Sequence, residues 1–483
     1  MSNSLTANLN GPNVTGSIKQ FLRGIGPYVQ FLSAVLMIAV CTIGVLCMSG
    51  CGGPATDPQR VEPDSPSVEE TPAPKEAETL EPAVPDDVTP SEPGRVSAAA
   101  PEDVEAAKAL LDGLGPTVRY TVVPDGVLTE IVIRDGAGLS ADDIALFGRL
   151  ADLETLQILD CRELNDGMAA RLAGLKNLTR LAITNSAITD ATVEMITQSF
   201  PGLNELDLSS NTLLTNSALR VITELTRLER LSLVQNRFND LGTSHLAKLE
   251  NLRALDLRGN MEAGNMTMQV VSELPRLAAL RHRSTTVDDF GIEYLGQSKT
   301  LDSLLIQDFM ITSQAGQHLA RLATLRQLEI FRCQGFGSDG VLALAGMELI
   351  RLTLRDLPMV DDMAMAVFAD LPQLRRLYLH ELASVGDSGL ENLSKLPSLE
   401  LLDIWELPQM TDATVEVIAG LPNLKVLSIR TTGVTDAAVD KLLGMSNLES
   451  LTFKENGMVT AEGLKKLSEA EFRTLDIGQS GGR

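Results

Sequence analysis

The chain has 483 residues and carries 64 Asp plus Glu against 40 Lys plus Arg, which gives a formal net charge of -24 at pH 7. This acidic balance argues against nucleic acid as a partner, because nucleic-acid binding needs a basic surface that displaces counterions. None of the five cysteines stands in a C-x-x-C spacing, so the composition also argues against zinc held by thiolates, and no metal or other cofactor is expected.

Residues 1–51 carry a targeting pattern. Residues 28–48 form an uncharged run of 21 residues, long enough to span about 31 Å of bilayer as a helix. Lys19 and Arg23 precede this run, and positive flanks stay in the cytoplasm. The pattern therefore predicts that everything after residue 51 is exported.

The end of this segment, Met48-Ser49-Gly50-Cys51, resembles the lipobox of bacterial lipoproteins. The resemblance implies that Cys51 is lipidated and becomes the mature amino terminus. An uncleaved signal anchor is the alternative, because the apolar run is longer than that of most signal peptides. Both interpretations predict a membrane-anchored, extracytoplasmic chain, on the periplasmic or cell-surface side.

Two further segments precede the repeats. Residues 52–101 hold eleven of the chain's 22 prolines among many Asp and Glu residues, a composition that predicts a disordered tether. Residues 102–127 combine an amphipathic helical stretch, the strand-like VRYTVV and a Pro124-Asp125-Gly126 turn. We interpret 102–127 as an N-terminal cap that covers the open end of a repeat core.

Residues 128–483 repeat the phrase L-x-x-L-x-L/I every 24 or 25 residues, about 15 times. A period of this length predicts a solenoid in which each unit packs only on its neighbours. The repeats start at Leu128, Leu153, Leu178, Leu203, Leu228, Leu252, Leu277, Leu301, Leu325, Leu349, Leu374, Leu399, Leu424, Leu448 and Phe472.

One repeat shows the expected local structure. Leu178, Leu181 and Ile183 alternate along a short predicted strand and point inward, and Thr189-Asp190 then precedes a helical stretch that a Thr or Asp can cap. Stacked units of strand, turn and helix predict an α/β right-handed horseshoe, with a parallel sheet on its concave face and short helices on its convex face. The capping pair recurs at Thr411-Asp412 and Thr435-Asp436, with looser versions at Val287-Asp288-Asp289, Ser338-Asp339 and Gly386-Asp387.

The eighth residue after the first Leu of a repeat is a further signature. It is Cys at Cys161 and Cys333, where we expect buried packing residues, and Asn at Asn211, Asn236, Asn260 and Asn456. These residues resemble the leucine-rich repeat family, most closely its ribonuclease-inhibitor-like and cysteine-containing types. Together with the lipobox, the layout resembles exported bacterial leucine-rich repeat lipoproteins. The pattern departs from the family at Leu357, Leu382 and Leu407, where this position is apolar and the turn geometry is uncertain.

The resemblance implies a protein-binding scaffold whose ligand lies on the concave sheet, and it implies no catalysis. The residues between the inward leucines predict a basic and aromatic concave stripe, the candidate site for a protein or an anionic or glycan-bearing cell-envelope ligand. The alternative is that these arginines only neutralise neighbouring acids. The stripe comprises Arg258, Arg283, Gln307, Phe331, Arg355, His380, Trp405, Arg430 and Lys454, with Arg281, Arg351, Arg376 and Tyr378 in the adjacent columns.

No catalytic motif stands in the sequence, so no enzyme is expected. His245 and His318 are predicted on outer helices and His282 in an inward slot, kept neutral by Arg281 and Arg283. None of the histidines has a second His or a carboxylate at ligand spacing. Acid pairs such as Asp288-Asp289 stand at helix starts, where capping explains them.

Three classes of function remain at this point. The leading one is an exported, membrane-tethered scaffold that binds a protein or envelope partner through the concave sheet. A substrate receptor of a larger complex, as similar repeats in ubiquitin-ligase receptors imply, is the second, although an export signal contradicts it. A rigid structural spacer in the envelope is the third.

Overall fold

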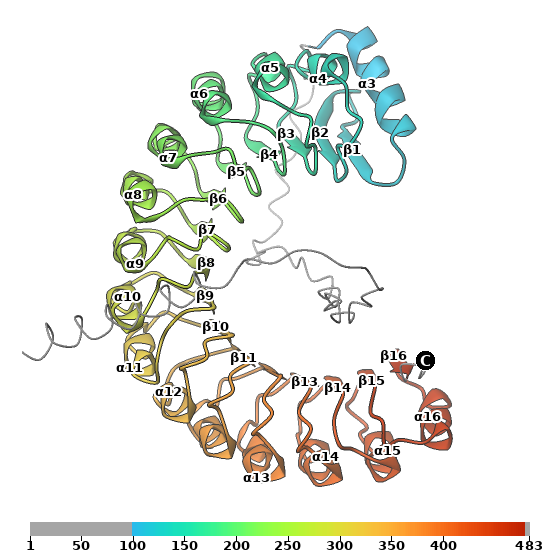
Figure 1. Ribbon diagram of the computed structural model, residues 1–483. Coiled ribbons are helices and arrows are strands. Elements are labelled where there is room, and N and C mark those ends of the chain that lie inside the picture. Colours follow the sequence, from blue (N-terminus) through green and yellow to red (C-terminus); the bar gives the residue numbers. More distant parts are fainter. Residues whose placement is uncertain (1–98, 479–483) are drawn as a thin grey trace, which may run out of the picture. The chain divides into compact units, whose positions relative to one another are not determined.

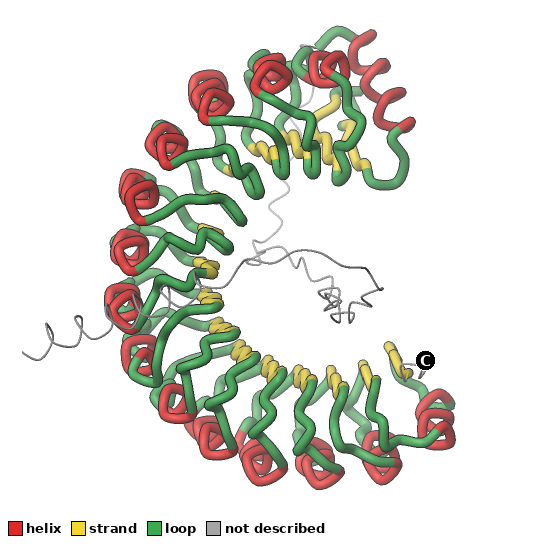
Figure 2. Tube along the Cα trace, viewed as in Figure 1, coloured by secondary structure: helices red, strands yellow, loops and turns green. Residues whose placement is uncertain are grey.

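The computed structural model describes residues 99–478, which form one curved stack of repeats (Figure 1). Sixteen strands make a single sheet in chain order. The first pair is antiparallel and every later pair is parallel. The strands line the concave face and the helices cover the convex face (Figure 2), so the predicted α/β leucine-rich repeat solenoid is confirmed.

The strands are short and regularly spaced. They are β1 (Val118–Val122), β2 (Leu128–Ile133), β3 (Thr155–Ile158), β4 (Arg180–Ile183), β5 (Glu205–Asp207), β6 (Arg230–Ser232), β7 (Ala254–Asp256), β8 (Ala279–Arg283), β9 (Ser303–Gln307), β10 (Gln327–Phe331), β11 (Arg351–Arg355), β12 (Arg376–His380), β13 (Leu401–Trp405), β14 (Val426–Arg430), β15 (Ser450–Lys454) and β16 (Thr474–Gly478).

The helices alternate with the strands. They are α3 (Pro101–Gly113), α4 (Ala141–Phe147), α5 (Asp166–Ala169), η1 (Ala170–Leu172), α6 (Asp190–Ser199), α7 (Asn216–Ile222), α8 (Asp240–Thr243), η2 (Ser244–Lys248), α9 (Asn265–Ser272), α10 (Asp289–Leu295), α11 (Ala315–Leu319), α12 (Ser338–Leu342), η3 (Asp362–Asp370), α13 (Asp387–Leu390), η4 (Glu391–Lys395), α14 (Asp412–Ala419), α15 (Asp436–Leu443) and α16 (Ala461–Ser468), where η marks 3-10 geometry.

The curvature follows from the two kinds of layer. Neighbouring strands stand about 4.8 Å apart, whereas packed helices need about 8–10 Å between their axes, so the helical side of each repeat is wider. The inward leucines fill the space between the layers. Leu178, Leu181 and Ile183 are at most 2% exposed, and the same positions of the other repeats continue one core along the stack.

The helix and strand expected before the first repeat are present as α3 and β1. Val104, Ala107 and Leu111 of α3 are buried, and Gly126 takes a positive φ of 82° in the turn that leads into β2. The limits 102–127 for a separate cap stay a prediction. Residues 28–48, Cys51 and the tether up to residue 98 lie outside the described residues; within 99–478 no helix is long and apolar enough to cross a membrane.

The asparagine position works as a ladder between repeats. Asn236 donates from Nδ2 to the carbonyl oxygens of Leu208 and Leu233, and its Oδ1 accepts the backbone N–H of Asn211. Asn260 repeats the pattern with Leu233 and Leu257. These amides satisfy turn groups that would otherwise be buried without partners.

The apolar versions of this position keep the same turn. Leu357, Leu382 and Leu407 are fully buried. The residue before each of them has a left-handed backbone, as the residues before most of the asparagines do, with φ values of 50° to 54° at Asp356, Glu381 and Glu406. The turn geometry therefore does not depend on the asparagine, and the slot is filled by packing instead.

The Thr-Asp pairs join two repeats as well as capping one helix. Thr189, Thr411 and Thr435 each accept the second helical N–H, as expected for N-caps. The Asp that follows such a cap accepts hydrogen bonds from the next repeat: Asp412, directly after Thr411, accepts from the N–H and Oγ1 of Thr435 at 2.8 and 2.6 Å. Capping by itself was therefore an incomplete explanation of these acids.

Gly337 and Gly386 stand at the N-cap position of the looser motifs and give no side-chain cap. Cys161 and Cys333 are free and buried, as predicted. Burial raises the pKa of the Cys333 thiol to about 12 and also raises that of Cys161. Both thiols therefore stay protonated and act as packing groups.

Candidate functional site on the concave face

The strand register places the predicted stripe in one column. Successive partners in the parallel sheet are Arg283, Gln307, Phe331, Arg355, His380, Trp405, Arg430 and Lys454. Arg258, two residues past the end of β7, extends the column at its amino-terminal side. The adjacent columns hold Arg281, Arg351, Arg376 and Tyr378 on β8, β11 and β12, as the alternation of the strands predicts.

Aromatic rings and guanidinium groups stack along this column. The guanidinium carbon of Arg355 lies 4.5 Å from the Phe331 ring centre and 5.1 Å from that of Trp405. The guanidinium carbon of Arg430 also lies near the same indole, 5.4 Å from its ring centre. We call Phe331, Arg355, His380, Trp405 and Arg430 the aromatic platform.

The platform continues through edge-on ring contacts. The His380 ring meets Trp405 at 5.8 Å and Tyr378 at 6.0 Å, both near perpendicular, and Arg351 lies 4.6 Å from the Tyr378 ring centre. Each such cation–ring contact contributes about 0.5–1 kcal/mol at a partly exposed site. Together they hold long side chains in fixed positions before any partner arrives.

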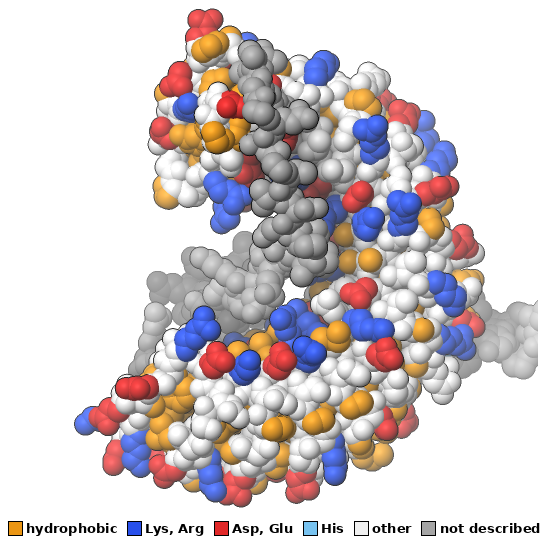
Figure 3. All heavy atoms as spheres, turned by 180° about the vertical axis from the view of Figure 1, so that it is seen from behind, with side chains coloured by type: hydrophobic (Ala, Val, Ile, Leu, Met, Phe, Trp, Pro, Cys, Tyr) orange, Lys and Arg blue, Asp and Glu red, His pale blue; other side chains and the backbone are white. Residues whose placement is uncertain are grey.

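Most cations of the stripe are paired with acids. Figure 3 shows Lys and Arg side chains alternating with Asp and Glu along the inner rim of the lower part of the arc. Neutralisation, the alternative considered for these arginines, therefore describes much of the column. The pairs are Arg258–Asp256 at 2.7 Å, Arg283–Asp308 at 2.5 Å, Arg355–Glu381 at 2.9 Å, Arg430–Asp403 at 3.1 Å and Lys454–Asp476 at 2.6 Å.

Two cations of the adjacent columns differ from these. Within residues 99–478, Arg281 and Arg376 make no hydrogen bond or ion pair that reaches a carboxylate. Arg281 is half-buried, and burial together with the nearby Arg258 lowers its pKa. Arg281 lies on β8, on the amino-terminal side of the platform, whereas Arg376 lies on β12, among the strands that carry the platform.

Two expectations about histidines need correction. His380 does have a carboxylate beside it: its Nε2 lies 3.4 Å from Oδ2 of Asp403 on the next strand. Burial alone would raise the pKa of Asp403, but His380, Arg430 and Ser428 together outweigh burial and hold it below its usual range. Sequence spacing missed this contact because the two residues are neighbours only through the sheet register.

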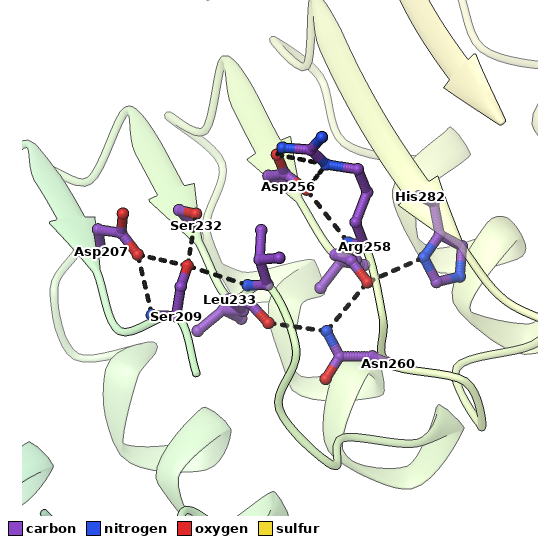
Figure 4. A network of polar contacts seen from close by, with 10 residues as sticks. Asp207, Ser209, Ser232, Leu233, Asp256, Arg258, Asn260 and His282 are labelled. Carbon is purple, nitrogen blue, oxygen red and sulfur yellow. Dashed lines mark hydrogen bonds and ion pairs between the residues drawn. The ribbon is translucent and has the colours of Figure 1, made fainter. Parts of the chain in front are cut away.

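His282 is fully buried, as predicted. The reason why its ring stays neutral differs from the expected one. Its pKa is lowered by burial, not by Arg281 and Arg283. Its Nδ1 lies 3.2 Å from the Leu257 carbonyl oxygen and its Nε2 lies 2.8 Å from that of Ala263. The Asn260 amide also contacts the Leu257 carbonyl oxygen, and Figure 4 shows the Asn260 and His282 side chains directed at one shared atom, so the imidazole continues the asparagine ladder by one repeat.

The two remaining histidines lie on helices, and the described residues form no metal site. His245 lies in η2 and His318 in α11, on the outer helices as expected. Within the described part of the chain, no three His, Cys, Asp or Glu side chains gather in a way that could hold a metal ion.

Residues 186–474 match the family described as leucine-rich repeat region. The chain belongs to the leucine-rich repeat family. No curated protein matches the chain.

Among solved structures, this leucine-rich repeat chain is similar to an internalin from Listeria monocytogenes, with 20% identity and a TM-score of 0.41 over 74% of this chain and 95% of that one. It is also similar to the yeast Rad7 and Elc1 complex, with 18% identity and a TM-score of 0.49 over 79% and 92%. A TLR13–ssRNA13 complex matches with 18% identity and a TM-score of 0.40 over 69% and 57%. These likenesses concern the fold alone.

The leucine-rich repeat sheet carries a second polar feature, which the sequence patterns did not reveal. An open hollow of about 490 Å³ lies at the ends of β3 to β6. We call it the acidic hollow. Its lining residues are Leu159, Asp160, Thr184, Asn185, Asp207, Ser209, Ser210, Thr212 and Gln235. The signal that could have found it is the run of polar residues directly after the strands.

Proposed function

We propose that the chain is a non-catalytic scaffold that binds a protein partner through the aromatic platform of its concave face. Membership of the leucine-rich repeat family supports a protein-binding role. The observation that carries the proposal is the cluster in which Arg355 contacts the rings of both Phe331 and Trp405, and Arg430 contacts the same indole. Trp, Tyr and Arg are the residue types that dominate interface energies, and here they are already ordered.

The pairing of charges refines the expected ligand. Because Arg355 and Arg430 already hold Glu381 and Asp403, the platform offers flat ring and guanidinium surface more than free positive charge. This supports a folded protein surface with aromatic or aliphatic side chains as partner. A polyanionic envelope ligand, the alternative expectation, would have to displace these acids.

Binding through the platform is tested with the triple variant Arg355→Ala, Trp405→Ala and Arg430→Ala. Full-length wild-type and variant chains are used as bait, after circular dichroism has confirmed that both are folded. We expect the partner retained by the wild type to be lost from the triple variant, by about 100-fold or more in affinity, because several central contacts vanish together. A rigid spacer would show the same retained proteins with both baits.

A matched control comes from residues that lie outside the strands of the concave sheet. The variant Arg276→Ala, Phe290→Ala and Arg321→Ala removes the same types of side chain, and Phe290 is 69% exposed. It should retain the partner like the wild type. Loss of the partner from this control as well would contradict binding on the concave face.

The proposal includes export and attachment to a membrane through Cys51 or an uncleaved anchor. Its support is the apolar run 28–48 after Lys19 and Arg23 and the lipobox-like Met48-Ser49-Gly50-Cys51. Mass spectrometry of the mature amino terminus tests it. A diacylglyceryl group on Cys51 would support the lipoprotein form, whereas an intact Met1 or Ser2 would exclude it and leave the anchor.

A further inference from the structure

His380 lies in the middle of the aromatic platform and has a ring nitrogen without a hydrogen bond. Its side chain is 12% exposed, and among residues 99–478 its buried Nε2 finds no hydrogen-bond partner. The ring meets Tyr378 and Trp405 edge-on, at 6.0 and 5.8 Å between ring centres. A buried polar atom without a partner costs free energy, so its place in the platform requires an explanation.

Asp403 is the carboxylate that faces this nitrogen. Its Oδ2 lies 3.4 Å from Nε2, whereas a charge-assisted hydrogen bond between such atoms is about 2.7–2.9 Å long. Both oxygens of Asp403 already accept from one Nη2 of Arg430, at 3.1 Å each. The imidazole therefore stands beside a balanced pair of one guanidinium and one carboxylate without being bonded to it.

The other charges near His380 are largely balanced as well. Arg355, the register partner of His380 on β11, is paired with Glu381 at 2.9 Å. Glu406, next to Trp405, has its pKa raised by burial and then by Glu381. The charged and titratable groups on the elements around the ring are Arg376, Tyr378 and Glu381 on and after β12, Arg351, Arg355 and Asp356 on and after β11, Asp403 and Glu406 on and after β13, and Arg430 on β14.

Protonation of the ring changes this balance by one charge. Histidine changes its charge between pH 5 and 8. When the neutral ring takes a proton from water, both of its nitrogens become N–H donors, and Nε2 can donate to Oδ2 of Asp403. The imidazolium then shares this carboxylate with Arg430, and the platform gains one positive charge. Closing the 3.4 Å gap also shifts the ring relative to Trp405, its edge-on neighbour.

We infer that His380 makes the aromatic platform pH-sensitive: the neutral ring permits binding of the protein partner, and the protonated ring bonds Asp403 and weakens that binding. The inference rests on the proposed function, because it names the regulation of the same site. A partner that covers the platform removes its water, so an imidazolium that has only a share of Asp403 must be desolvated. The free chain then binds a proton that the complex excludes, and affinity therefore decreases as pH falls.

Trp405 reports on the ring directly, because it is the only tryptophan of the chain. The full-length chain is titrated from pH 8 to 5, and circular dichroism at each pH confirms that it stays folded. We expect one sigmoidal step in the Trp405 emission, and quenching by iodide that is stronger at pH 5.5 by less than about twofold, because the platform has gained a positive charge. The variant His380→Gln should lose both effects. A wild-type emission that stays constant, or a step that persists in His380→Gln, would overturn the inference.

Two control variants assign the step to His380. His318→Gln makes the same substitution on α11, away from the platform, and Glu406→Gln removes the acid next to Trp405. Both should keep the step of the wild type. Loss of the step in either control would assign it to a different titrating group and contradict the inference.

The effect on binding is measured with the same full-length chains as bait at pH 7.5 and 5.5. Retention of the partner by the wild type should fall by about tenfold at pH 5.5, the effect of one excluded proton over one pH unit. Retention by His380→Gln should not depend on pH. Equal wild-type retention at both pH values would overturn the regulation. If the triple platform variant keeps the partner while the emission step still depends on His380, the proposed function fails and the pH response of the platform stands.

Discussion

In β5 to β7 the strands have three residues and are followed by a buried asparagine, whereas β11 to β13 have five residues and are followed by a buried leucine. At this position the first group has side-chain amides that reach backbone carbonyls of the preceding repeat, whereas the second group has a packed leucine. One backbone turn thus accepts two different fillings, because the left-handed residue before the slot already sets the direction of the chain.

The two regions also present opposite surfaces. Around β3 to β6, Asp160 and Asp207 have no described cation beside them. Around β10 to β14, Arg355 and Arg430 hold acids and stack on Trp405. Charge type read from the sequence is therefore a poor guide here: Arg355 and Arg430 are neutralised by neighbouring acids, whereas no Lys or Arg of residues 99–478 lines the hollow that holds Asp160 and Asp207.

The largest effect on stability is expected from exchanging the residue types at the asparagine position between the two regions. In Asn236→Leu, the buried N–H of Asn211 loses its acceptor, and we expect the free energy of unfolding to fall by about 2–4 kcal/mol. The mirror variant Leu382→Asn buries an amide in a dry slot and should lose a similar amount. Urea unfolding followed by circular dichroism measures both. A change below about 0.5 kcal/mol in either variant would show that the two fillings are interchangeable.

The end of the amide ladder is sensitive to pH through His282. Burial lowers the pKa of His282 from 6.5, so the imidazole is neutral in the folded chain while the unfolded chain takes up a proton below pH 6.5. The unfolded state then binds more protons, and stability decreases as pH falls, by about 1.4 kcal/mol per pH unit at most. Above pH 6.5 this contribution is complete and constant.

Urea midpoints at pH 7.5 and 5.5 measure this effect, with His282→Leu as the control because the neighbouring repeats carry Leu257 and Ile306 at this position. The wild type should lose about 1 kcal/mol more than the control between these two pH values. Equal losses would show that the buried ring does not titrate differently on unfolding.

The Asp–Thr hydrogen bonds between successive helix starts should contribute equally in both regions. The two regions then differ only on the sheet side. Asp387 accepts three hydrogen bonds, from the N–H and Oγ1 of Thr411 and from Oγ1 of Thr414. Burial pushes its pKa up, but these bonds outweigh burial and lower it. The stabilisation is therefore complete above pH 3.8 and is lost as pH falls further.

Asp387→Asn should reduce the free energy of unfolding at pH 7 by about 1 kcal/mol, a value kept small by solvent screening. Asp166→Asn, in the amino-terminal region, should lose about the same because Thr189 and Thr192 bond it in the same way. Asp339→Asn removes an exposed acid without such bonds and should change stability little. Thermal unfolding measures all three, and a large loss in Asp339→Asn would contradict the ladder.

The smallest effect concerns the neutralised charge near Trp405, the only tryptophan of the chain. Glu381→Gln frees Arg355 from its ion pair and should increase quenching of Trp405 fluorescence by iodide, by less than about twofold, because an anion is drawn to the unpaired guanidinium. Quenching by neutral acrylamide should stay unchanged. Asp160→Asn, in the distant acidic hollow, is the control, and an equal increase there would mean that only net charge matters.

Much of the fold follows from repeat spacing. Leu178, Leu181 and Ile183 are buried as predicted, and the stripe from Arg283 to Lys454 lies in one column because each repeat contributes one strand to a parallel sheet. The period sets the register, so residues a whole repeat apart become neighbours. The Thr caps were readable for the same local reason, since a cap and its helix are adjacent in the chain.

The sequence by itself thus determined the solenoid, its inward residues and the position of the concave columns, because periodic burial constrains all of them locally. Only the tertiary structure decided what the side chains do there. The contact of His380 with Asp403 and the bond from Thr411 to Asp387 depend on which rotamer reaches across a repeat boundary. Such contacts depend on the direction in which each side chain points as well as on the spacing of the residues. The side-chain direction is set only when neighbouring repeats are packed.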